Sequence, residues 1–457
     1  MNKRKIYFVG AGGIGMAALE RYFLSQGYEV GGYDRTPSEL THDLEAEGIG
    51  ITYDDSAEAI APQFRNPGET LVVYTPAIPE SHPGLAWFRA NGFEVVKRAA
   101  VLGLVTRQSK ALCFAGTHGK TTTSSMAAHL LHSLPVGCNA FLGGVLRNYN
   151  TNFLLCETSP YSVVEADEYD RSFHHLHPYI AVITATDPDH LDIYGTEEAY
   201  LESFAHFTEL IQPGGVLIKH TGLKLQERPH PSVKVYTYSL DEGDFHAENI
   251  RRGNGTITFD FVTPDGGRID SIELGVPVEI NITNAIAALA AVWATGELTP
   301  DVARSAMASF MGPKRRFEFW LKKPQGPVVI DDYAHHPDEL RNSIASVRAL
   351  FPGRKLTVAF QPHLYTRTRD FAPEFAEALS AADRVILCDI YPAREEPIPG
   401  VTSEIILQDV NVPDKKVIRK ADLVSTLAAD GFDVLLTVGA GDICNYLPEI
   451  VNLPICK

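Results

Sequence analysis

Residues 111–131 read ALCFAGTHGKTTTSSMAAHLL, and this stretch decides the fold class. An apolar run predicts a buried strand, a glycine-bearing loop follows it, and a helix pattern comes next. A strand, a glycine-bearing loop and a helix in this order form a phosphate-binding site, because backbone N–H groups and the positive end of the helix face the anion. Lys120 would reach the outer phosphates, and the Thr121 hydroxyl would meet Mg²⁺. The stretch therefore predicts a nucleotide-binding loop in an α/β fold, although Phe114 stands where the usual pattern has glycine.

Composition limits the classes of function. The 457 residues are enough for two to four domains, and the formal net charge of -17 argues against non-specific nucleic-acid binding and against a polybasic membrane anchor. The first apolar run is too short for a signal peptide, and no segment approaches the length of a membrane span. The 6 cysteines are scattered without C-x-x-C spacing, which is typical of reduced core residues. We therefore expect a cytoplasmic protein with no nucleic-acid or membrane partner.

A second phosphate-binding pattern opens the chain. Residues 5–9 form a buried-strand pattern, and GAGGIG at residues 10–15 is a G-x-G-x-x-G sequence before a helix pattern. Asp34 ends the next predicted strand about twenty residues later, the position of a ribose-binding acid. A further strand, residues 70–74, leads to a proline-bounded loop that begins at Thr75. The pattern predicts a Rossmann-like unit that binds a nucleotide or pyrophosphate, or else merely a tight turn between strand and helix.

Acidic residues follow two predicted strands downstream of the phosphate loop. Residues 165–170 read EADEYD after one buried strand, and residues 187–192 read DPDHLD after the next. Hard cations take oxygen ligands and bridge to ATP phosphates, so acids at the carboxyl ends of such strands predict a Mg²⁺ site. His190, between two aspartates, is a candidate ligand. A solvated acidic loop is the alternative interpretation.

The remainder of the chain contains three further patterns. Short alternating strands at 216–219 and 256–261 predict an antiparallel extension of the central domain. Asn281 and Asn284 then open an alanine-rich helix, which either asparagine could cap.

From about residue 326, strand and helix patterns alternate again. Four of these strands end in polar tips rich in His and Arg, which predict one ligand-facing edge of a parallel sheet. These tips begin at Asp331, Gln361, Asp389 and Val438.

Taken together, the motifs resemble the Mur ligases, the ATP-dependent amide-forming enzymes that build the peptide of bacterial cell-wall precursors. The resemblance covers essentially the whole chain and is most specific in GTHGKTT at 116–122, EADE at 165–168, DH at 189–190, DYAHHP at 332–337 and QPH at 361–363. It implies a three-domain α/β architecture. The domains would be a Rossmann-like UDP-sugar-binding domain at 1–107, a central P-loop ATPase domain at 108–313 and a Rossmann-like amino-acid-binding domain at 314–457.

Within the family, His118, His335-His336 and Gln361 to His363 resemble the member that uses L-alanine. The resemblance thus implies ATP-dependent ligation of L-alanine to the lactyl carboxylate of UDP-N-acetylmuramate through an acyl phosphate, in peptidoglycan precursor synthesis. It implies ATP and Mg²⁺ as cofactors, with two ions and with Mn²⁺ able to substitute, and a monomer or homodimer. The alternative is the ligase that recycles muramyl tripeptide with the same donor, against which residues 389–403 argue.

The resemblance also assigns roles to individual residues. The UDP-sugar would contact Gly12, Gly13, Ile14, Asp34 and Thr75. ATP would contact Gly116, Thr117, His118, Gly119, Lys120, Thr121, Thr122, Asn281, Asn284, Arg316 and Asp332. The metal ligands would be Thr121, Glu168 and His190, and the amino acid would meet Tyr333, His335, His363 and Arg367. The catalytic set would be Lys120, Glu168, His190, His335 and Arg367.

Three positions depart from the family pattern. Ile280 stands where relatives often have histidine, Ala185 replaces an asparagine, and Leu364 occupies a place often held by arginine. Two other classes of protein are alternatives to a Mur ligase. A nicotinamide-dependent oxidoreductase would explain the glycines at 10–15 but not Lys120, and a nucleotide-regulated binding protein would leave the His- and Arg-rich tips without a role.

Overall fold

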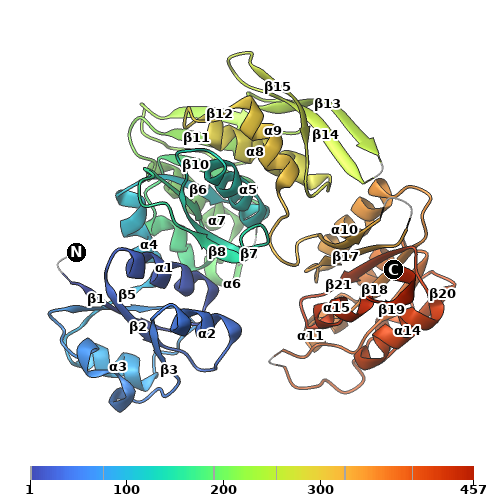
Figure 1. Ribbon diagram of the computed structural model, residues 1–457, viewed down its shortest axis with the longest axis horizontal. Helices are drawn as coiled ribbons and strands as arrows, with labels where there is room; N and C mark the ends of the chain where they lie inside the picture. Colours follow the sequence, from blue (N-terminus) through green and yellow to red (C-terminus); the bar gives the residue numbers. More distant parts are fainter. Residues whose placement is uncertain (1–2, 76, 189–190, 254, 324–325, 394) are drawn as a thin grey trace. The chain divides into compact units, whose positions relative to one another are not determined.

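The computed structural model describes residues 3–75, 77–188, 191–253, 255–323, 326–393 and 395–457. The chain forms two compact units, which are described separately. Unit 1 comprises Met1–Glu248, Asp260–Ile272 and Thr283–Met307, and unit 2 comprises Asn249–Phe259, Glu273–Ile282 and Ala308–Lys457. Both units are built of sheets with helices packed on them, as the sequence predicts (Figure 1).

Unit 1 begins with a parallel five-stranded sheet of order β3-β2-β1-β4-β5. Its strands are β1 (Lys5–Val9), β2 (Glu29–Tyr33), β3 (Gly50–Thr52), β4 (Thr70–Tyr74) and β5 (Glu94–Lys97). Its helices are α1 (Ile14–Ser25), α2 (Glu39–Ala46), η1 (Ala57–Ala59), η2 (Pro62–Phe64), α3 (Pro83–Ala90) and α4 (Arg98–Arg107). The strand order reverses beside β1, and ligands bind parallel sheets at such a switch point.

The second sheet of unit 1 has seven strands in the order β12-β11-β10-β6-β9-β7-β8. They are β6 (Lys110–Ala115), β7 (Asn139–Leu146), β8 (Thr151–Leu154), β9 (Tyr161–Glu165), β10 (Ile180–Ile183), β11 (Val216–His220) and β12 (Lys234–Tyr238). The helical elements of this region are α5 (Lys120–His132), η3 (Tyr169–His175), α6 (Leu191–Tyr194), α7 (Glu197–Glu209), α8 (Ile280–Trp293) and α9 (Pro300–Ser309).

One predicted strand belongs to a different sheet from the one expected. The prediction of an antiparallel extension at 216–219 is wrong, because β11 pairs in parallel with β10 inside the central sheet. Val216 to Ile218 form a continuous buried apolar run, as expected of a strand inside a parallel sheet, and only Lys219 and His220 at its end are half-buried. The strand predicted at 256–261 instead lies in a separate three-stranded sheet of order β13 (His246–Gly253), β14 (Thr256–Val262) and β15 (Arg268–Glu273).

Unit 2 is organised around a six-stranded sheet of order β16-β17-β21-β18-β19-β20. The strands are β16 (Glu318–Lys322), β17 (Val328–Asp332), β18 (Leu356–Phe360), β19 (Arg384–Leu387), β20 (Asp414–Val417) and β21 (Val434–Val438), and only β16 is antiparallel to its neighbour. The helices are α10 (Pro337–Leu350), α11 (Tyr365–Asp370), α12 (Ala372–Leu379), α13 (Glu404–Leu407), η4 (Lys420–Asp422), α14 (Leu423–Asp430), η5 (Ile443–Tyr446), α15 (Leu447–Ile450) and η6 (Pro454–Cys456).

The first two sheets share one hydrophobic core. Ile6 and Phe8 of β1 face this core together with residues of α1, α4 and the central sheet, whereas Tyr7 and Val9 face a second core on the other side of β1. A strand buried on both faces reads as a continuous apolar run, which is why the sequence pattern predicted it. The boundary predicted after residue 107 falls between β5, which ends at Lys97, and β6, which begins at Lys110. The boundary predicted after residue 313 falls before β16, which begins at Glu318. They remain predictions, because the compact units do not separate the first two sheets.

A buried acid in unit 2 leads to a prediction about pH. Asp331 is 0% exposed; its Oδ1 accepts a hydrogen bond from the Thr437 hydroxyl, and its Oδ2 lies 3.5 Å from Arg315 Nε. Burial raises the pKa of Asp331 from 3.8 to about 6, and the hydroxyl and the guanidinium only partly oppose it. Since the folded-state pKa is raised, the contribution of this group to stability is complete below about pH 4 and is lost as pH rises through 6.

Asp331→Asn removes this titration. We subtract the free energy of unfolding of the original protein from that of the variant. This difference should rise by about 2–3 kcal/mol between pH 4 and pH 7.5. Denaturant unfolding of both chains at several pH values measures the difference. Asp433→Asn is the control: a hydrogen bond from Arg354 lowers the pKa of Asp433, so its difference should stay nearly flat above pH 5. A flat Asp331→Asn profile would contradict the prediction.

Candidate active site

The phosphate loop joins β6 to α5 and requires glycine at two points. Gly116 has φ 137° and Gly119 has φ 83°, both in the left-handed region that favours glycine. A methyl group on Gly116 would lie 2.2 Å from Thr184 Oγ1, so the loop packs directly on the end of β10. The Thr117 N–H donates to the Ala185 carbonyl (3.1 Å). Since that contact uses only the backbone of Ala185, the departure from the family pattern there leaves the loop intact.

Helix α5 begins at Lys120 with its first turn open to an anion. No side chain in the described part of the chain caps its N-terminus, and its first turn consists of Lys120, Thr121 and Thr122, none of which is acidic. The Lys120 ammonium donates to the Gly116 carbonyl (2.6 Å) and lies 2.7 Å from Glu168 Oε2. The sequence predicted Lys120 and Glu168 in one site, and the structure brings them into contact. The positive helix end and this cation together fit a polyphosphate.

Glu165 is a member of the site that sequence reasoning did not select. Its Oε1 accepts a hydrogen bond from the Thr121 hydroxyl (3.1 Å), and its Oε2 accepts one from the Gly143 N–H (3.1 Å). The signal was present, since Glu165 belongs to the same EADE motif as Glu168. Burial raises the pKa of both carboxyl groups, and Lys120 opposes this at each of them. A dication beside these oxygens would lower both pKa values again.

The hydroxyl of Thr121 and the carboxylates of Glu165 and Glu168 are the oxygen donors that Mg²⁺ prefers, so the donor set fits this ion. The third predicted ligand, His190, lies outside the described residues. Among the residues that the structure describes, no group of three or more His, Cys, Asp and Glu side chains has the arrangement of a metal site. A magnesium site here would therefore take further ligands from the nucleotide phosphates.

Other predicted ATP contacts lie beside this loop or in the second unit. The His118 carbonyl accepts a hydrogen bond from the Thr184 hydroxyl, and the Thr117 hydroxyl bonds to the Tyr200 hydroxyl (2.9 Å). The Thr123 hydroxyl donates to Asn284 Oδ1 (3.3 Å), which places Asn284 against α5. Asn281 belongs to unit 2, where its Nδ2 donates to the Val276 carbonyl (3.1 Å).

The predicted UDP-sugar residues meet at one edge of the first sheet. The Gly12 N–H donates to Asp34 Oδ2 (2.6 Å), and a methyl group on Gly10 would lie 3.0 Å from Thr75 Cγ2. Gly13 is the N-cap of α1, and Ile14 is its first residue. The structure therefore brings the glycine loop, Asp34 and Thr75 together, with one Asp34 oxygen already bonded to the loop. Their contacts with a nucleotide remain a prediction.

Asn152 of β8 connects this loop to the central sheet. Its side chain is 1% exposed, and its Nδ2 donates to the Ile14 carbonyl (2.6 Å). We expect Asn152→Ala to lower the free energy of unfolding by about 1–3 kcal/mol, because the substitution removes the hydrogen bond made by this buried amide. Urea denaturation measures this. Asn91→Ala, which removes an exposed amide that donates to Trp87 O (2.8 Å), should change stability far less, and equal effects would contradict the expectation.

In unit 2, predicted residues gather at the carboxyl ends of β17 and β18. The rings of His335 and His363 are 6.0 Å apart, and Arg367 is close enough to lower the pKa of both. Burial is the main cause of the lowered pKa at each histidine. His363 Nδ1 and Arg367 Nη1 are buried atoms with no hydrogen-bond partner among the described residues. Such atoms are rare in native folds, and together they fit an anionic ligand that also carries a donor.

Leu364, a second departure from the family pattern, has a structural role beside these groups. It has φ 70°, in the left-handed region, and its N–H donates to the Tyr391 carbonyl (2.9 Å). The ring of Tyr391 stacks on His363, with centroids 5.7 Å apart. A residue other than glycine is strained in the left-handed region. Such backbone strain persists only where neighbouring contacts enforce it, and it is often found at functional sites. Here it turns the chain between His363 and α11, the helix that contains Arg367.

The predicted ATP contacts of unit 2 lie next to this cluster. Asp332 Oδ1 accepts from the Phe317 N–H (3.1 Å), and its other oxygen accepts from the Ser343 hydroxyl. Arg316 is exposed and lies over the Tyr333 ring, 5.6 Å from the centroid. The Tyr333 N–H donates to the Arg315 carbonyl (2.8 Å). The cluster is therefore held by backbone contacts, and the Arg316 guanidinium remains accessible.

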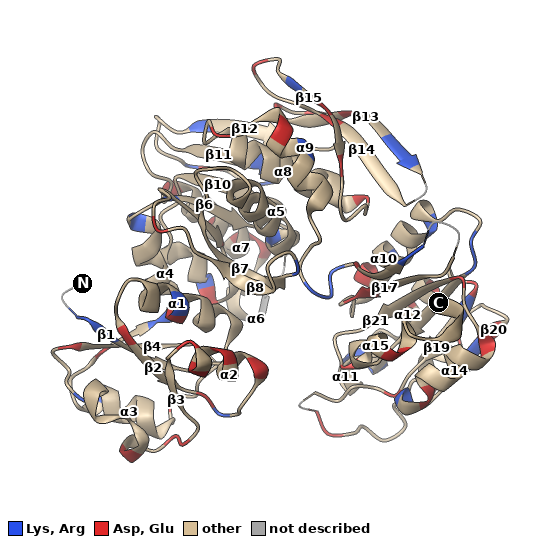
Figure 2. Ribbon diagram, viewed as in Figure 1, with Lys and Arg blue, Asp and Glu red and all other residues tan. Residues whose placement is uncertain are grey.

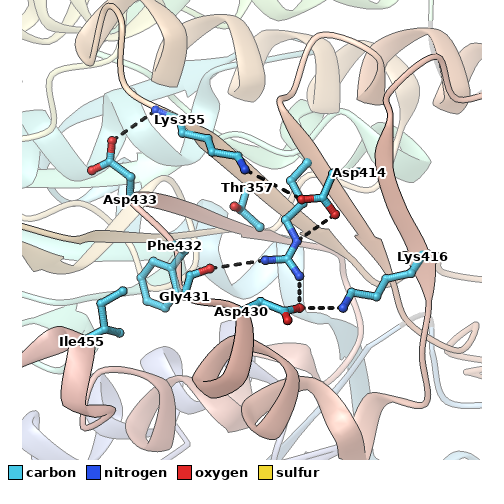
Figure 3. A pocket seen from close by; sticks show the side chains of 10 residues that line it. Lys355, Thr357, Asp414, Lys416, Asp430, Gly431, Phe432, Asp433 and Ile455 are labelled. Carbon is cyan, nitrogen blue, oxygen red and sulfur yellow. Dashed lines mark hydrogen bonds and ion pairs between the residues drawn. The ribbon is translucent and has the colours of Figure 1, made fainter.

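A polar cavity of about 570 Å³ lies at the opposite, amino-terminal edge of this sheet. Figure 3 shows Lys416 reaching Asp430 (2.6 Å) and the Lys355 N–H donating to Asp433 (3.1 Å). Arg384 Nε lies 3.5 Å from Asp414 Oδ1. Because its charged groups pair with one another and ligands bind such sheets at the carboxyl edge, this cavity is not part of the candidate site.

Comparison with known proteins agrees with this geometry. Residues 5–110 match the model described as Mur ligase family, catalytic domain. Residues 114–292 match Mur ligase middle domain, and residues 315–441 match Mur ligase, glutamate ligase domain. A relative from Phocaeicola vulgatus named UDP-N-acetylmuramate–L-alanine ligase is 59% identical, with 98% of each chain covered. This chain belongs to the Mur ligase family.

Two further relatives of this Mur ligase are informative. A protein of the same name from Parabacteroides distasonis is 59% identical over 99% of this chain and 97% of its own length. The solved structure of UDP-N-acetylmuramate-alanine ligase from Thermotoga maritima has a TM-score of 0.80 at 27% identity, with 98% of each chain covered. The predicted family and the three-domain α/β architecture are thereby confirmed.

Proposed function

We propose that this Mur ligase joins L-alanine to the lactyl carboxylate of UDP-N-acetylmuramate as ATP is cleaved to ADP and phosphate, a step of peptidoglycan precursor synthesis. One observation carries the proposal: relatives with that name are 59% identical over nearly the whole chain. Two separate features support it independently: unit 1 has an open phosphate loop, and unit 2 has two buried nitrogen atoms without a hydrogen-bond partner among the described residues. An oxidoreductase would use neither feature.

The first half-reaction is phosphorylation of the carboxylate, since a carboxylate is a poor electrophile. A lactyl oxygen attacks the γ-phosphorus of ATP, the bond to the β,γ-bridging oxygen breaks, and an acyl phosphate and ADP result. The first turn of α5 and Lys120 would hold the phosphates and offset the charge of the two reacting anions. Bound Mg²⁺, held by Thr121, Glu165 and Glu168, would polarise the transferred phosphoryl group.

The second half-reaction is attack of the alanine amine on the acyl carbon, with phosphate as the leaving group. The Arg367 guanidinium would bind the carboxylate of alanine, because its Nη1 has no partner in the described part of unit 2. The lowered pKa values keep His363 and His335 neutral near pH 7, so the free Nδ1 of His363 can accept a proton from the alanine ammonium. Unprotonated amine is the form that attacks.

We place the reaction in the cytoplasm, with small molecules as its partners and with a monomer or homodimer as the active form. In the described residues, no helix has the length and apolarity that crossing a membrane requires. All six cysteines are free, as in a reducing compartment. Figure 2 shows Lys and Arg interspersed with Asp and Glu in both units, which supports small-molecule substrates over a nucleic acid.

Phosphate release from ATP with Mg²⁺ and UDP-N-acetylmuramate tests the proposal. We expect release with L-alanine and little release without an acceptor. Release only with the tripeptide L-alanyl-γ-D-glutamyl-diaminopimelate would assign the chain to the recycling branch instead. Omission of Mg²⁺ and its replacement by Mn²⁺ test the metal requirement in the same assay. Sedimentation of the active enzyme determines its oligomeric state.

A further inference from the structure

Helix α11 has no cap of its own. It is six residues long, and its N-cap position is occupied by Leu364, whose apolar side chain cannot accept a hydrogen bond. A helix of this length is marginal without outside contacts, because few of its backbone groups are bonded within the helix. Arg367 lies in this helix and His363 lies just before it. The placement of both groups therefore depends on what holds the first turn of α11.

A carboxylate from a distant segment holds that turn. Glu395 is 29 residues further along the chain than Thr366, and its Oε2 accepts a hydrogen bond from the Thr366 N–H (3.0 Å). Its Oε1 accepts a second hydrogen bond from the Thr366 hydroxyl. The hydroxyl and the N–H both lower the pKa of Glu395, so the carboxylate is ionised near pH 7. Glu395 thus acts as the N-terminal cap of α11, and its negative charge suits the positive end of the helix.

The same distant segment also binds the residues that precede α11. The Tyr391 N–H donates to the Pro362 carbonyl (2.8 Å), and the Tyr391 carbonyl accepts from the Leu364 N–H (2.9 Å). His363 and Tyr391 form a parallel β-bridge between these two hydrogen bonds. These backbone contacts fix His363, and the carboxylate of Glu395 extends the same attachment into the helix.

We propose that Glu395 is a positioning residue for the amino-acid substrate, because by holding Thr366 it directs the adjacent Arg367 guanidinium toward the alanine carboxylate. The inference rests on the proposed function. A guanidinium binds a carboxylate through two parallel hydrogen bonds, and such an arrangement tolerates little displacement. Loss of Glu395 should therefore weaken the use of alanine. It should leave the KM for ATP unchanged, since none of the predicted ATP contacts lies in α11.

The charge of Glu395 has a second, separable effect on His363. Burial is the largest cause of the lowered pKa of this imidazole, and His335 and Arg367 lower the pKa further, whereas Glu395 raises it. Removal of the carboxylate charge should therefore lower the pKa of His363. Since neutral His363 is the form that accepts a proton, the acidic limb of the pH–rate profile should move to lower pH. A change that only loosened the fold would not move the limb in this direction.

Initial rates of phosphate release over a range of L-alanine concentrations, at several pH values, test the proposal. Glu395→Ala should lower kcat/KM for L-alanine by about 10- to 100-fold, with the KM for ATP unchanged. Glu395→Gln can still accept a hydrogen bond from the Thr366 N–H, so it should retain most of kcat/KM while the acidic limb moves to lower pH. Thr366→Val removes only the hydroxyl contact and should cause a smaller loss than Glu395→Ala. The control is Glu396→Ala, which replaces the exposed neighbour and should behave as the original protein does.

A Glu395→Ala enzyme with unchanged kcat/KM for L-alanine would overturn the proposal. A loss shared equally by L-alanine and ATP would also overturn it, because Glu395 would then support unit 2 as a whole. If Glu395→Ala fails to fold, Thr366→Val decides the question, and an unchanged kcat/KM in that variant would count against the proposal. The proposed function is judged on the original protein. It fails if that protein releases no phosphate with L-alanine, and Glu395 then has no alanine to position.

Discussion

Replacing Lys120 by alanine is expected to lower the rate of alanine-dependent phosphate release by about a thousandfold. The Lys120 ammonium lies at the start of α5, within 2.7 Å of Glu168 and 2.6 Å of the Gly116 carbonyl. Its side chain is largely buried, so the charge is held at the helix end where the outer phosphates would bind. The loss should appear mainly in kcat, since the charge that Lys120 balances develops as the phosphoryl group is transferred.

Steady-state phosphate release at saturating substrates measures the effect. Lys110→Ala is the matched control, because Lys110 begins the preceding strand, is exposed, and places its ammonium over the face of Tyr179, 5.3 Å from the ring centroid. Thermal unfolding of each variant separates loss of the loop's chemistry from loss of the fold. A Lys120→Ala enzyme that retains most of its kcat would remove the phosphate loop from the mechanism.

Arg367→Ala is expected to lower kcat/KM for L-alanine by about a hundredfold, with the KM for ATP unchanged. The guanidinium lies near His335 and His363, and its Nη1 has no partner among the described residues, so the native contacts of unit 2 do not depend on it. The same change removes a cation that lowers the pKa of His363. The acidic limb of the pH–rate profile should therefore move to higher pH in the variant.

The control is Arg369→Ala on the same helix. Arg369 is exposed and donates to Asp370 (2.7 Å), so its removal should leave both kcat/KM and the pH profile unchanged. Measurement of initial rates over a range of L-alanine concentrations, at several pH values, distinguishes the two variants. Equal losses in both would mean that α11 acts only as a structural element.

Local pattern predicted the two loops that define the candidate site. Each consists of a buried strand, glycines and a helix in direct succession, and all three parts depend on residues within about 25 positions of one another. The positive φ values of Gly116 and Gly119 are the kind of requirement that a glycine in such a loop signals. The start of α10 at Pro337 is local for a similar reason, because His336 and Glu339 cap the helix.

Pairings between distant segments were not predictable in this way. The EADE motif indicated an acidic site, yet only the register of β6 against β9, which pairs Phe114 with Glu165, shows that Glu165 meets Thr121. The strand at 216–219 was predicted to be antiparallel, because a short apolar run does not show which strand it pairs with or in which direction.

By itself, the sequence determined the α/β class, the family, the two phosphate-binding loops and the His- and Arg-bearing strand ends. The tertiary structure alone decided which side chains have partners. It pairs Lys120 with Glu168 and Asn152 with Ile14, and it leaves Arg367 Nη1 without a hydrogen-bond partner among the described residues. The physical reason is that backbone preferences and hydrophobic period act over a few residues. Whether a buried charge finds a counterion depends on segments that only folding brings together.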